Sequence, residues 1–244
     1  KNENFGIVIG GHYAGINVTG NKFMDNNCQH GLMAFRGMEK KMKIEENEIS
    51  SNIGKYMVEF NADSQSEILG EVFAVFRYNV LKDNRVESRK IFAGGRSFFR
   101  GTRSNPIDRT CVICFGGVQQ VQVFRNLVSG NMQDYDLVAG VKSARLGNFL
   151  NAQENWWGSR DPIFIENRIF DFDDWNNHAE ARWRPYLIED SILGSISVSF
   201  NDNQTVDLDN LGGRIYYDLT LRRRDTPYVI KRDITIMPEV TLNI

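Results

Sequence analysis

Apolar and polar residues alternate over short stretches of this chain, and the alternation returns five times around an asparagine. The five segments read GINVTGNKFMDN, KMKIEENEISSN, FAVFRYNVLKDN, VQVFRNLVSGN and SARLGNFLNAQ. The anchor asparagines on which they align are Asn21, Asn47, Asn79, Asn126 and Asn148. An alternation with a period of two predicts short β-strands, because successive side chains of a strand point to opposite faces.

Other positions around the anchor repeat as well. The residue two places after it is apolar in every row: Phe23, Ile49, Leu81, Val128 and Leu150. The residue five places after it is an amide: Asn26, Asn52, Asn84, Asn131 and, in the last row, Gln153. The positions three and five before the anchor are apolar in four rows, whereas the fifth row has Arg145 and Ser143 there. A slip of one residue, with Leu146 turned inward, stays open for that row.

The spacing of the anchors indicates a stack of units. Successive anchors lie 26, 32, 47 and 22 residues apart, so we expect the second interval to carry an insertion and the third to contain one irregular turn. Units of this length are too short to bury their own apolar faces and must stack on their neighbours. We predict an all-β chain wound as a parallel β-helix, with the repeated asparagines hydrogen-bonded into ladders along common edges.

The stretch NAQENWWGSRDP follows the last row and contains two adjacent tryptophans, whose side chains point to opposite faces of a strand. It resembles the closing element of right-handed β-helix proteins of the pectate-lyase-like superfamily, in which N-x-W-G and a loop precede P-y-L. The matching residues are Asn155, Trp157, Gly158, Pro185, Tyr186 and Leu187. The resemblance implies a right-handed β-helix whose end is closed by Trp156, Trp157 and Gly158.

Residues 146–244 resemble the bark beetle (Anakonda)-like family of extracellular proteins more specifically. The resemblance lies in NAQENWWGSRDPIFIENRIFDFDDWNNHAEARWRPYL and in TPYVIKRDITIMPEVTLNI. It implies a membrane-anchored or secreted protein of epithelial cell junctions, with no catalytic activity and no cofactor. Its expected partners are other protein modules or cell-surface proteins, and the chain is expected to be a piece of a longer protein.

The closing element also suggests a division of the chain. We expect β-helix coils over residues 1–158 and the closing loop of the stack over residues 159–189. A β-rich connector is expected over residues 190–227, where SISVSF and the turn in DNLGGRIYY are typical of strands and a hairpin. The first strand of a following β-helix block is expected over residues 228–244.

The charge balance limits the partners. Lys and Arg total 29 and Asp and Glu total 31, which predicts no nucleic-acid binding, and no apolar run is long enough for direct membrane contact. Residues 85–109 form a basic exception that contains Phe98 and Phe99. Two interpretations stay open: a site for an acidic glycan or acidic partner, and a surface loop whose aromatic rings pack back onto the column.

An enzyme is the alternative function, because parallel β-helices also carry polysaccharide lyases and glycosidases. The acidic cluster Asp171, Asp173 and Asp174 is the candidate cation or carboxylate site. It departs from a calcium loop, since Trp175 and Asn176 stand where a ligand and a glycine are required. The alternative for this cluster is a solvated loop, and for the chain a carbohydrate-active or glycan-binding module.

The cysteines and the glycosylation sequons bear on whether the protein is extracellular. Cys111 and Cys114 lie in RTCVICFGG without a second pair, so we expect buried free thiols in a strand rather than a zinc site. The tripeptides NVT and NQT make Asn17 and Asn203 candidate glycosylation sites. Asn17 stands between two expected inward residues and should point to solvent.

Overall fold

The structure, a computed structural model, describes most of the chain in two compact units, Lys1–Ser197 and Val198–Ile244. The described residues are 6–10, 15–36, 41–61, 74–86, 110–116, 121–141, 149–197, 208–209, 211–215, 218–237 and 240–244. Most of the described strands belong to the first unit.

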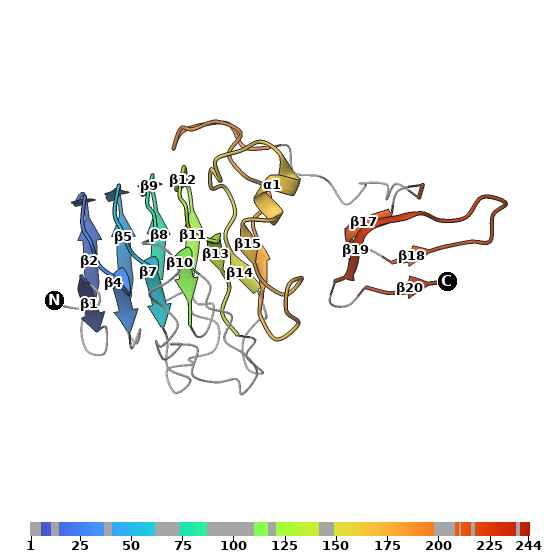
Figure 1. The fold of residues 1–244 in the computed structure, drawn as a ribbon, viewed down its shortest axis with the longest axis horizontal. Helices are drawn as coiled ribbons and strands as arrows, with labels where there is room; N and C mark the ends of the chain where they lie inside the picture. The colour runs from blue at the N-terminus through green and yellow to red at the C-terminus, as the bar shows by residue number, and fades with distance from the viewer. Residues whose placement is uncertain are drawn as a thin grey trace. The chain divides into compact units, whose positions relative to one another are not determined.

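Three parallel sheets form the first unit (Figure 1). The first sheet consists of β1 (Ile7–Gly10), β4 (Gly31–Arg36), β7 (Tyr56–Asn61), β10 (Cys111–Phe115), β13 (Tyr135–Val138) and β15 (Ile169–Phe170). The second consists of β2 (Ile16–Thr19), β5 (Met42–Glu45), β8 (Ala74–Arg77) and β11 (Val121–Phe124). The third consists of β3 (Lys22–Met24), β6 (Glu48–Ser50), β9 (Val80–Lys82) and β12 (Leu127–Ser129). A separate parallel pair joins β14 (Phe149–Asn151) to β16 (Glu180–Arg182).

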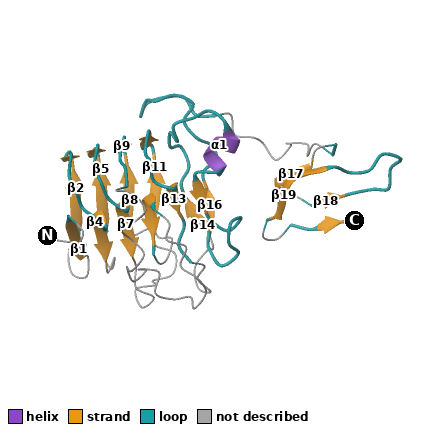
Figure 2. Ribbon diagram, in the orientation of Figure 1, coloured by secondary structure: helices purple, strands orange, loops and turns teal. Residues whose placement is uncertain are grey.

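The chain visits the sheets in a fixed order, so that β1, β2 and β3 make one coil and β4, β5 and β6 lie directly on it. Four such coils follow one another, and the strands β13, β14, β15 and β16 extend the stack by two more turns of the chain. Figure 2 shows the coils as parallel rows of strands. This arrangement confirms the prediction of an all-β chain with parallel strands in stacked sheets, and it is consistent with a β-helix-like solenoid.

The core of the stack is built from the alternating positions. In β5, for example, Met42 and Ile44 are buried while Lys43 is exposed, which is the predicted period of two. The inward aromatic rings line up along the stack, with Phe60 stacked between Phe35 and Phe115 at centroid distances of 5.2 Å. Neighbouring coils therefore bury one another's apolar faces, as a repeat too short to have its own core requires.

The segment expected as a closing loop, residues 159–189, contains regular structure. It holds α1 (Pro162–Glu166), β15 and β16, and the two strands continue the stack. Asp161 caps α1 by accepting a hydrogen bond from Ile163 N at 3.0 Å, and Pro162 occupies the first turn, where its missing N–H is not needed.

The second unit contains two parallel strand pairs. β17 (Leu211–Ile215) pairs with β19 (Ile230–Ile236), and β18 (Leu219–Thr220) pairs with β20 (Leu242–Asn243). The expected connector (190–227) and the expected start of a following block (228–244) thus contribute strands to the same unit. The division between the units lies at Ser197 and Val198.

Candidate functional site: the asparagine ladders and the ends of the stack

Four anchor asparagines form a ladder along the corner between the second and third sheets. Asn47 donates its backbone N–H and its Nδ2 to Asn79 Oδ1, at 3.0 and 2.9 Å. Asn79 makes the same pair of bonds to Asn126, at 2.9 and 3.0 Å. Asn21 makes them to Asn47, at 3.0 and 3.1 Å. Each amide oxygen inside the ladder therefore accepts two hydrogen bonds from the coil on its N-terminal side.

The remaining amide hydrogen of each rung is also used. Nδ2 of Asn79 donates to Ile44 O at 2.9 Å, and Nδ2 of Asn126 donates to Phe76 O at 2.9 Å. These carbonyls belong to the preceding coil, at the inward position three residues before its own rung. Asn47, Asn79 and Asn126 are almost fully buried, so their hydrogen bonds satisfy groups that water cannot reach.

The asparagines five places further on form a second ladder. Asn26 donates to Asn52, Asn52 to Asn84 and Asn84 to Asn131, each through the backbone N–H and Nδ2, at 2.8–3.1 Å. Before every rung the chain turns through a residue with positive φ. These residues are Gly20, Glu46, Tyr78, Arg125 and Glu154 in the first ladder and Asp25, Ser51, Asp83 and Gly130 in the second. The asparagine side chain and the left-handed residue before it together make the corner.

The fifth rung is Asn155 rather than the predicted Asn148. Asn126 N and Nδ2 both donate to Asn155 Oδ1 at 2.9 Å, whereas Asn148 lies outside the described residues. In this register the inward positions five and three before the anchor hold the fully buried Leu150 and Ala152. The predicted register placed Ser143 and Arg145 there, and those two polar residues were the signal that the row was misaligned.

The two adjacent tryptophans have different environments. Trp157 takes the inward position two places after the rung, is fully buried and belongs to the main hydrophobic core. Trp156 is half-buried, and its backbone forms a parallel bridge with Leu127. Gly158 follows with φ +79°, a left-handed conformation that favours glycine. Trp157 thus lies inside the fifth coil, as Val128 does one coil earlier.

The closed end of the stack lies beyond the tryptophan pair. Three side chains of the core cluster cover it: Ile165 from α1, Trp183 and Tyr186. Leu187 N donates to Asn155 O at 2.9 Å, so the residue before Leu187, Tyr186, takes the position of a sixth rung. The backbone N–H of Tyr186 donates to Ser197 Oγ at 2.9 Å, in the place where the Oδ1 of a following asparagine would otherwise accept. The Ser197 hydroxyl therefore ends the ladder.

Tyr186 is anchored at both of its polar groups. Its hydroxyl donates to Arg160 O at 2.9 Å, and burial raises the pKa of the phenol. Sequence reasoning assigned the end of the stack to Trp156, Trp157 and Gly158 and did not single out Trp183 or Ile165. The available signal was the apolar run IFIEN after an Asp-Pro cap, which is typical of a short helix with a buried side.

The acidic cluster is an internal hydrogen-bonding unit. Asp171 is fully buried; its carboxylate accepts from Asp173 N at 3.1 Å and from Ala181 N at 2.7 Å. Asp174 accepts from Asp171 N at 3.1 Å. Burial raises the pKa of the nearby Glu180. The positive charge of Arg182 lowers that pKa, and the negative charge of Asp171 raises it to a smaller extent. Among the described residues, no group of three potential metal ligands is assembled, and the cation site remains a prediction without a geometry to support it.

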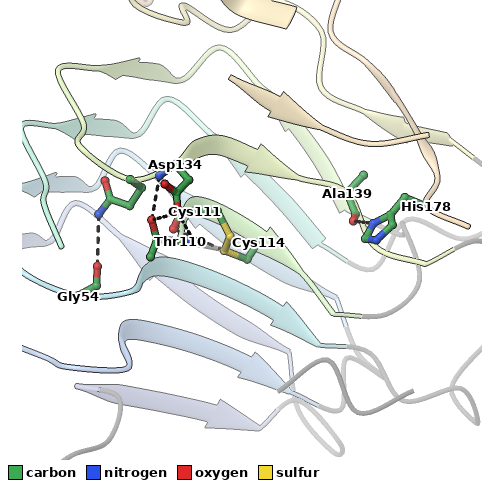
Figure 3. Close-up of a disulfide and its surroundings, with 8 residues drawn as sticks. Gly54, Thr110, Cys111, Cys114, Asp134, Ala139 and His178 are labelled. Atoms are coloured by element: carbon green, nitrogen blue, oxygen red, sulfur yellow. Dashed lines mark hydrogen bonds between the residues drawn. A yellow bond between two sulfur atoms is a disulfide. The ribbon is translucent and has the colours of Figure 1, made fainter. Parts of the chain in front are cut away.

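Cys111 and Cys114 form a disulfide within β10 (Figure 3). The prediction of free thiols is wrong, because the Cα atoms of this pair lie 5.9 Å apart, within the range that a disulfide spans. The expected burial is confirmed: both residues belong to a second hydrophobic cluster with Tyr56, Val138 and Phe170. Thr110 beside the disulfide donates through N and Oγ1 to Asp134, at 3.1 Å each.

Two buried carboxylates lie near this cluster. Asp136 pairs with Arg168 through two bonds of 2.8 and 3.1 Å, and burial nevertheless raises the pKa of Asp136. Glu59 on β7 is the strand neighbour of Cys114, and one of its carboxylate oxygens is buried without a hydrogen bond. Burial raises the pKa of Glu59 against the opposing effect of Arg36.

We expect Glu59→Gln to stabilise the chain at neutral pH and to leave its stability unchanged in acid. A carboxyl whose pKa is raised by folding destabilises the folded state progressively as the pH rises from its unfolded pKa, about 4.3, through the folded value. Glutamine cannot ionise, so the difference in the free energy of unfolding should grow over this window. Urea unfolding of both forms between acid and neutral pH measures it, and a difference that does not vary with pH would contradict the assignment.

The other predicted sites differ in how far the structure places them. Asn17 is exposed on β2, as expected for a sequon between inward residues, and Asn203 lies outside the described residues. Of the basic stretch, Arg85 is described and forms a parallel bridge with Ile53, while residues 87–109 lie outside. Neither the glycan interpretation of this stretch nor the surface-loop interpretation is tested.

A shallow groove of about 600 Å³ runs beside the first ladder. It lies between the corners of the first three coils and the loop that carries Ile192 and Leu193. Two carboxylates line it, Glu46 and Glu48, and Glu48 is paired with Lys22 at 3.1 Å. Carboxylates beside a base are also expected in a carbohydrate-active groove, but Lys22 of this ion pair is largely exposed, and exposed pairs of this kind contribute little.

The sheets, ladders and closed end define an all-β protein made of stacked parallel coils. In its described part, no helix is long and apolar enough to cross a membrane. Over its whole length the chain is 46% identical to Protein bark beetle of Drosophila melanogaster, and it spans 8% of that relative. The chain is therefore bark beetle-like along its entire sequence, which confirms the resemblance first seen in its C-terminal part. No family model and no solved structure matches it.

Proposed function

We propose that this chain is a non-catalytic extracellular segment of a bark beetle-like epithelial cell-junction protein, in which it serves as a rigid spacer and adhesion surface. The proposal includes a right-handed parallel β-helix of the pectate-lyase-like kind for the stack. The observation that carries it is the unbroken ladder from Asn21 to Asn155. Because every coil is hydrogen-bonded to the next at its sheets and corners, bending requires many bonds to break together.

Two features support an extracellular location. The Cys111–Cys114 disulfide is of the kind that persists in oxidising compartments. The sequon at Asn17 is exposed on an outward position of β2, so a glycan there would not disturb the core. The junctional setting, with other protein modules or cell-surface proteins as partners and no cofactor, is the part of the proposal that follows from the bark beetle-like resemblance of the sequence.

A spacer should tolerate the loss of one whole coil. Deleting residues 48–79 from the longer protein joins Asn47 to Val80, which is the strand partner of Glu48 and occupies the same place in its coil. The stack then shortens by about 4.8 Å with its ladders in register. We expect this protein to reach the surface of epithelial cells, to carry the Asn17 glycan, and to accumulate at cell contacts as the parent does.

The matched control deletes residues 48–63, which removes part of a coil and destroys the register of the ladder. This form should be retained inside the cell, as judged by surface biotinylation. Loss of contact accumulation by the whole-coil deletion, despite normal surface delivery, would place a specific site on the removed coil and contradict a spacer. Release of unsaturated ends from acidic polysaccharides by the parent chain, with calcium present, would instead support the carbohydrate-active alternative.

A further inference from the structure

The two ends of the stack are finished differently. At the closed end, Ile165 and Trp183 are no more than 1% exposed. At the other end, the inward side chains of the first coil are only partly buried: Ile7, Ile9, Ile16, Val18 and Phe23. Their strand partners one coil further on are at most 1% exposed: Met33, Phe35, Met42, Ile44 and Ile49. Among the residues that the structure describes, none covers the inward side chains of the first coil from the outside, and we call this end of the stack the open end.

The backbone at the open end forms the edge of all three described sheets. β1, β2 and β3 are each the last strand of their sheet, and within the described part of the chain nothing pairs with their outer side. Such edges are templates for a further strand, and proteins usually protect them with proline, bulges or covering segments. β1, β2 and β3 contain no proline, and their pairing with β4, β5 and β6 is free of register shifts.

The ladders give the open end a polarity. Every rung donates toward the closed end and accepts from the other side, as the bonds from Asn21 to Asn47 and from Asn26 to Asn52 show. Asn21 Oδ1 and Asn26 Oδ1 receive no hydrogen bond from any residue that the structure describes. The open end therefore offers two acceptors at fixed corners, between three unpaired strand edges and around an apolar centre.

We propose that the open end is the docking face for one further parallel coil, supplied by the preceding part of the longer polypeptide. That coil would pair with β1, β2 and β3, cover the inward side chains, and donate two amide hydrogens each to Asn21 and Asn26. It is strand addition in three sheets at once, with the ladder setting the register. The similar relative is far longer than this chain, which spans 8% of it, so such proteins contain chain enough for further coils.

A second copy of the chain fits this face less well. Two open ends brought together would set acceptor against acceptor at both corners. An open end placed on a closed end would meet Tyr186, whose N–H is already donated to Ser197, and the helix α1. A preceding coil with asparagine corners presents donors in the direction that Asn21 and Asn26 require.

The docking face can be tested by adding a coil of known register. Duplicating residues 6–31 in front of Gly6 places a second copy of the first coil at the 26-residue spacing that separates Ile7 from its partner Met33. Amide hydrogen exchange of Ile7–Gly10, Ile16–Thr19 and Lys22–Met24 should slow by at least about tenfold, as expected for edge amides that become interior. A matched duplicate carrying Asn21→Ala and Asn26→Ala in the added copy alone should give less protection.

Unchanged exchange in the duplicated chain would overturn the proposal. The natural occupant is tested in the intact longer protein, in which the same amides should be as protected as in the duplicate; exchange as fast as in the isolated chain would also overturn it. Sedimentation of the 244-residue chain without the duplication provides the remaining test, because it measures whether the chain forms dimers. A discrete dimer whose formation protects β1, β2 and β3 would make the occupant a second copy and refute the assignment.

Discussion

Asn79→Ala should destabilise the first unit by about 3 kcal/mol, because it removes four hydrogen bonds among buried groups and leaves the buried backbone N–H of Asn47 without its acceptor. Asn79 Oδ1 accepts from the backbone N–H and Nδ2 of Asn47, and its own Nδ2 serves Ile44 O and Asn126 Oδ1. All four partner groups are shielded from water. Alanine restores none of these bonds, so the loss exceeds that of an ordinary surface hydrogen bond.

Asn21→Ala is the matched control, since it removes a rung of the same ladder at its solvated end. Asn21 is exposed and its side chain accepts no hydrogen bond from a described residue. Water can replace its Nδ2 as a hydrogen-bond donor. We expect a loss below about 1 kcal/mol. Equilibrium urea unfolding, followed by circular dichroism, measures both variants. Equal losses at the two positions would mean that the ladder does not depend on burial for its effect.

Trp157→Ala should cost about 3–5 kcal/mol, the usual result of emptying a large buried aromatic site. Its side chain is fully buried and belongs to the main hydrophobic core of the stack. Trp156→Ala, at the adjacent and half-buried position, should cost much less, because that side chain points away from the core. The comparison uses the same residue type at two neighbouring positions of the chain.

A second substitution separates the volume of Trp157 from its polar atom. The indole Nε1 is buried without a hydrogen-bond partner, so its N–H contributes no bond to lose. Trp157→Phe should therefore recover much of the stability that alanine loses, leaving the cost of a smaller cavity. Thermal unfolding of Trp157→Ala, Trp157→Phe and Trp156→Ala in one series checks the order. A larger loss from Trp156→Ala than from Trp157→Ala would reverse the assignment of faces.

The sequence predicts the ladder where the alternation around the anchor is complete. Asn21, Asn47, Asn79 and Asn126 have apolar residues at every inward position, and each makes the expected pair of bonds. In the fifth row the prediction of Asn148 as the rung is wrong, because that register puts Arg145 at an inward position. The core does not tolerate an unpaired charge, so the inward pattern is a stronger guide to register than the anchor itself.

Other features could not be predicted because they depend on distances that spacing does not define. Two cysteines three residues apart are compatible with free thiols or a disulfide, and the local path of β10 decides between them. The acidic cluster is similar: Asp171 bonds to backbone N–H groups of Asp173 and Ala181, which only the folded loop brings together. The role of Tyr186 depends on Ser197, which lies beyond the predicted closing element.

The uneven lengths between rungs have a consequence for how such proteins diverge. Consecutive rungs of the first ladder are 26, 32, 47 and 29 residues apart, yet their bonds to one another stay between 2.9 and 3.1 Å. Most of the extra residues fall between β7 and β8 and between β9 and β10. The spacing between neighbouring coils is thus independent of the number of residues that connect one rung to the next. Homologues can vary in chain length at those two points without disturbing the scaffold, and a search that assumes a constant repeat length will miss them.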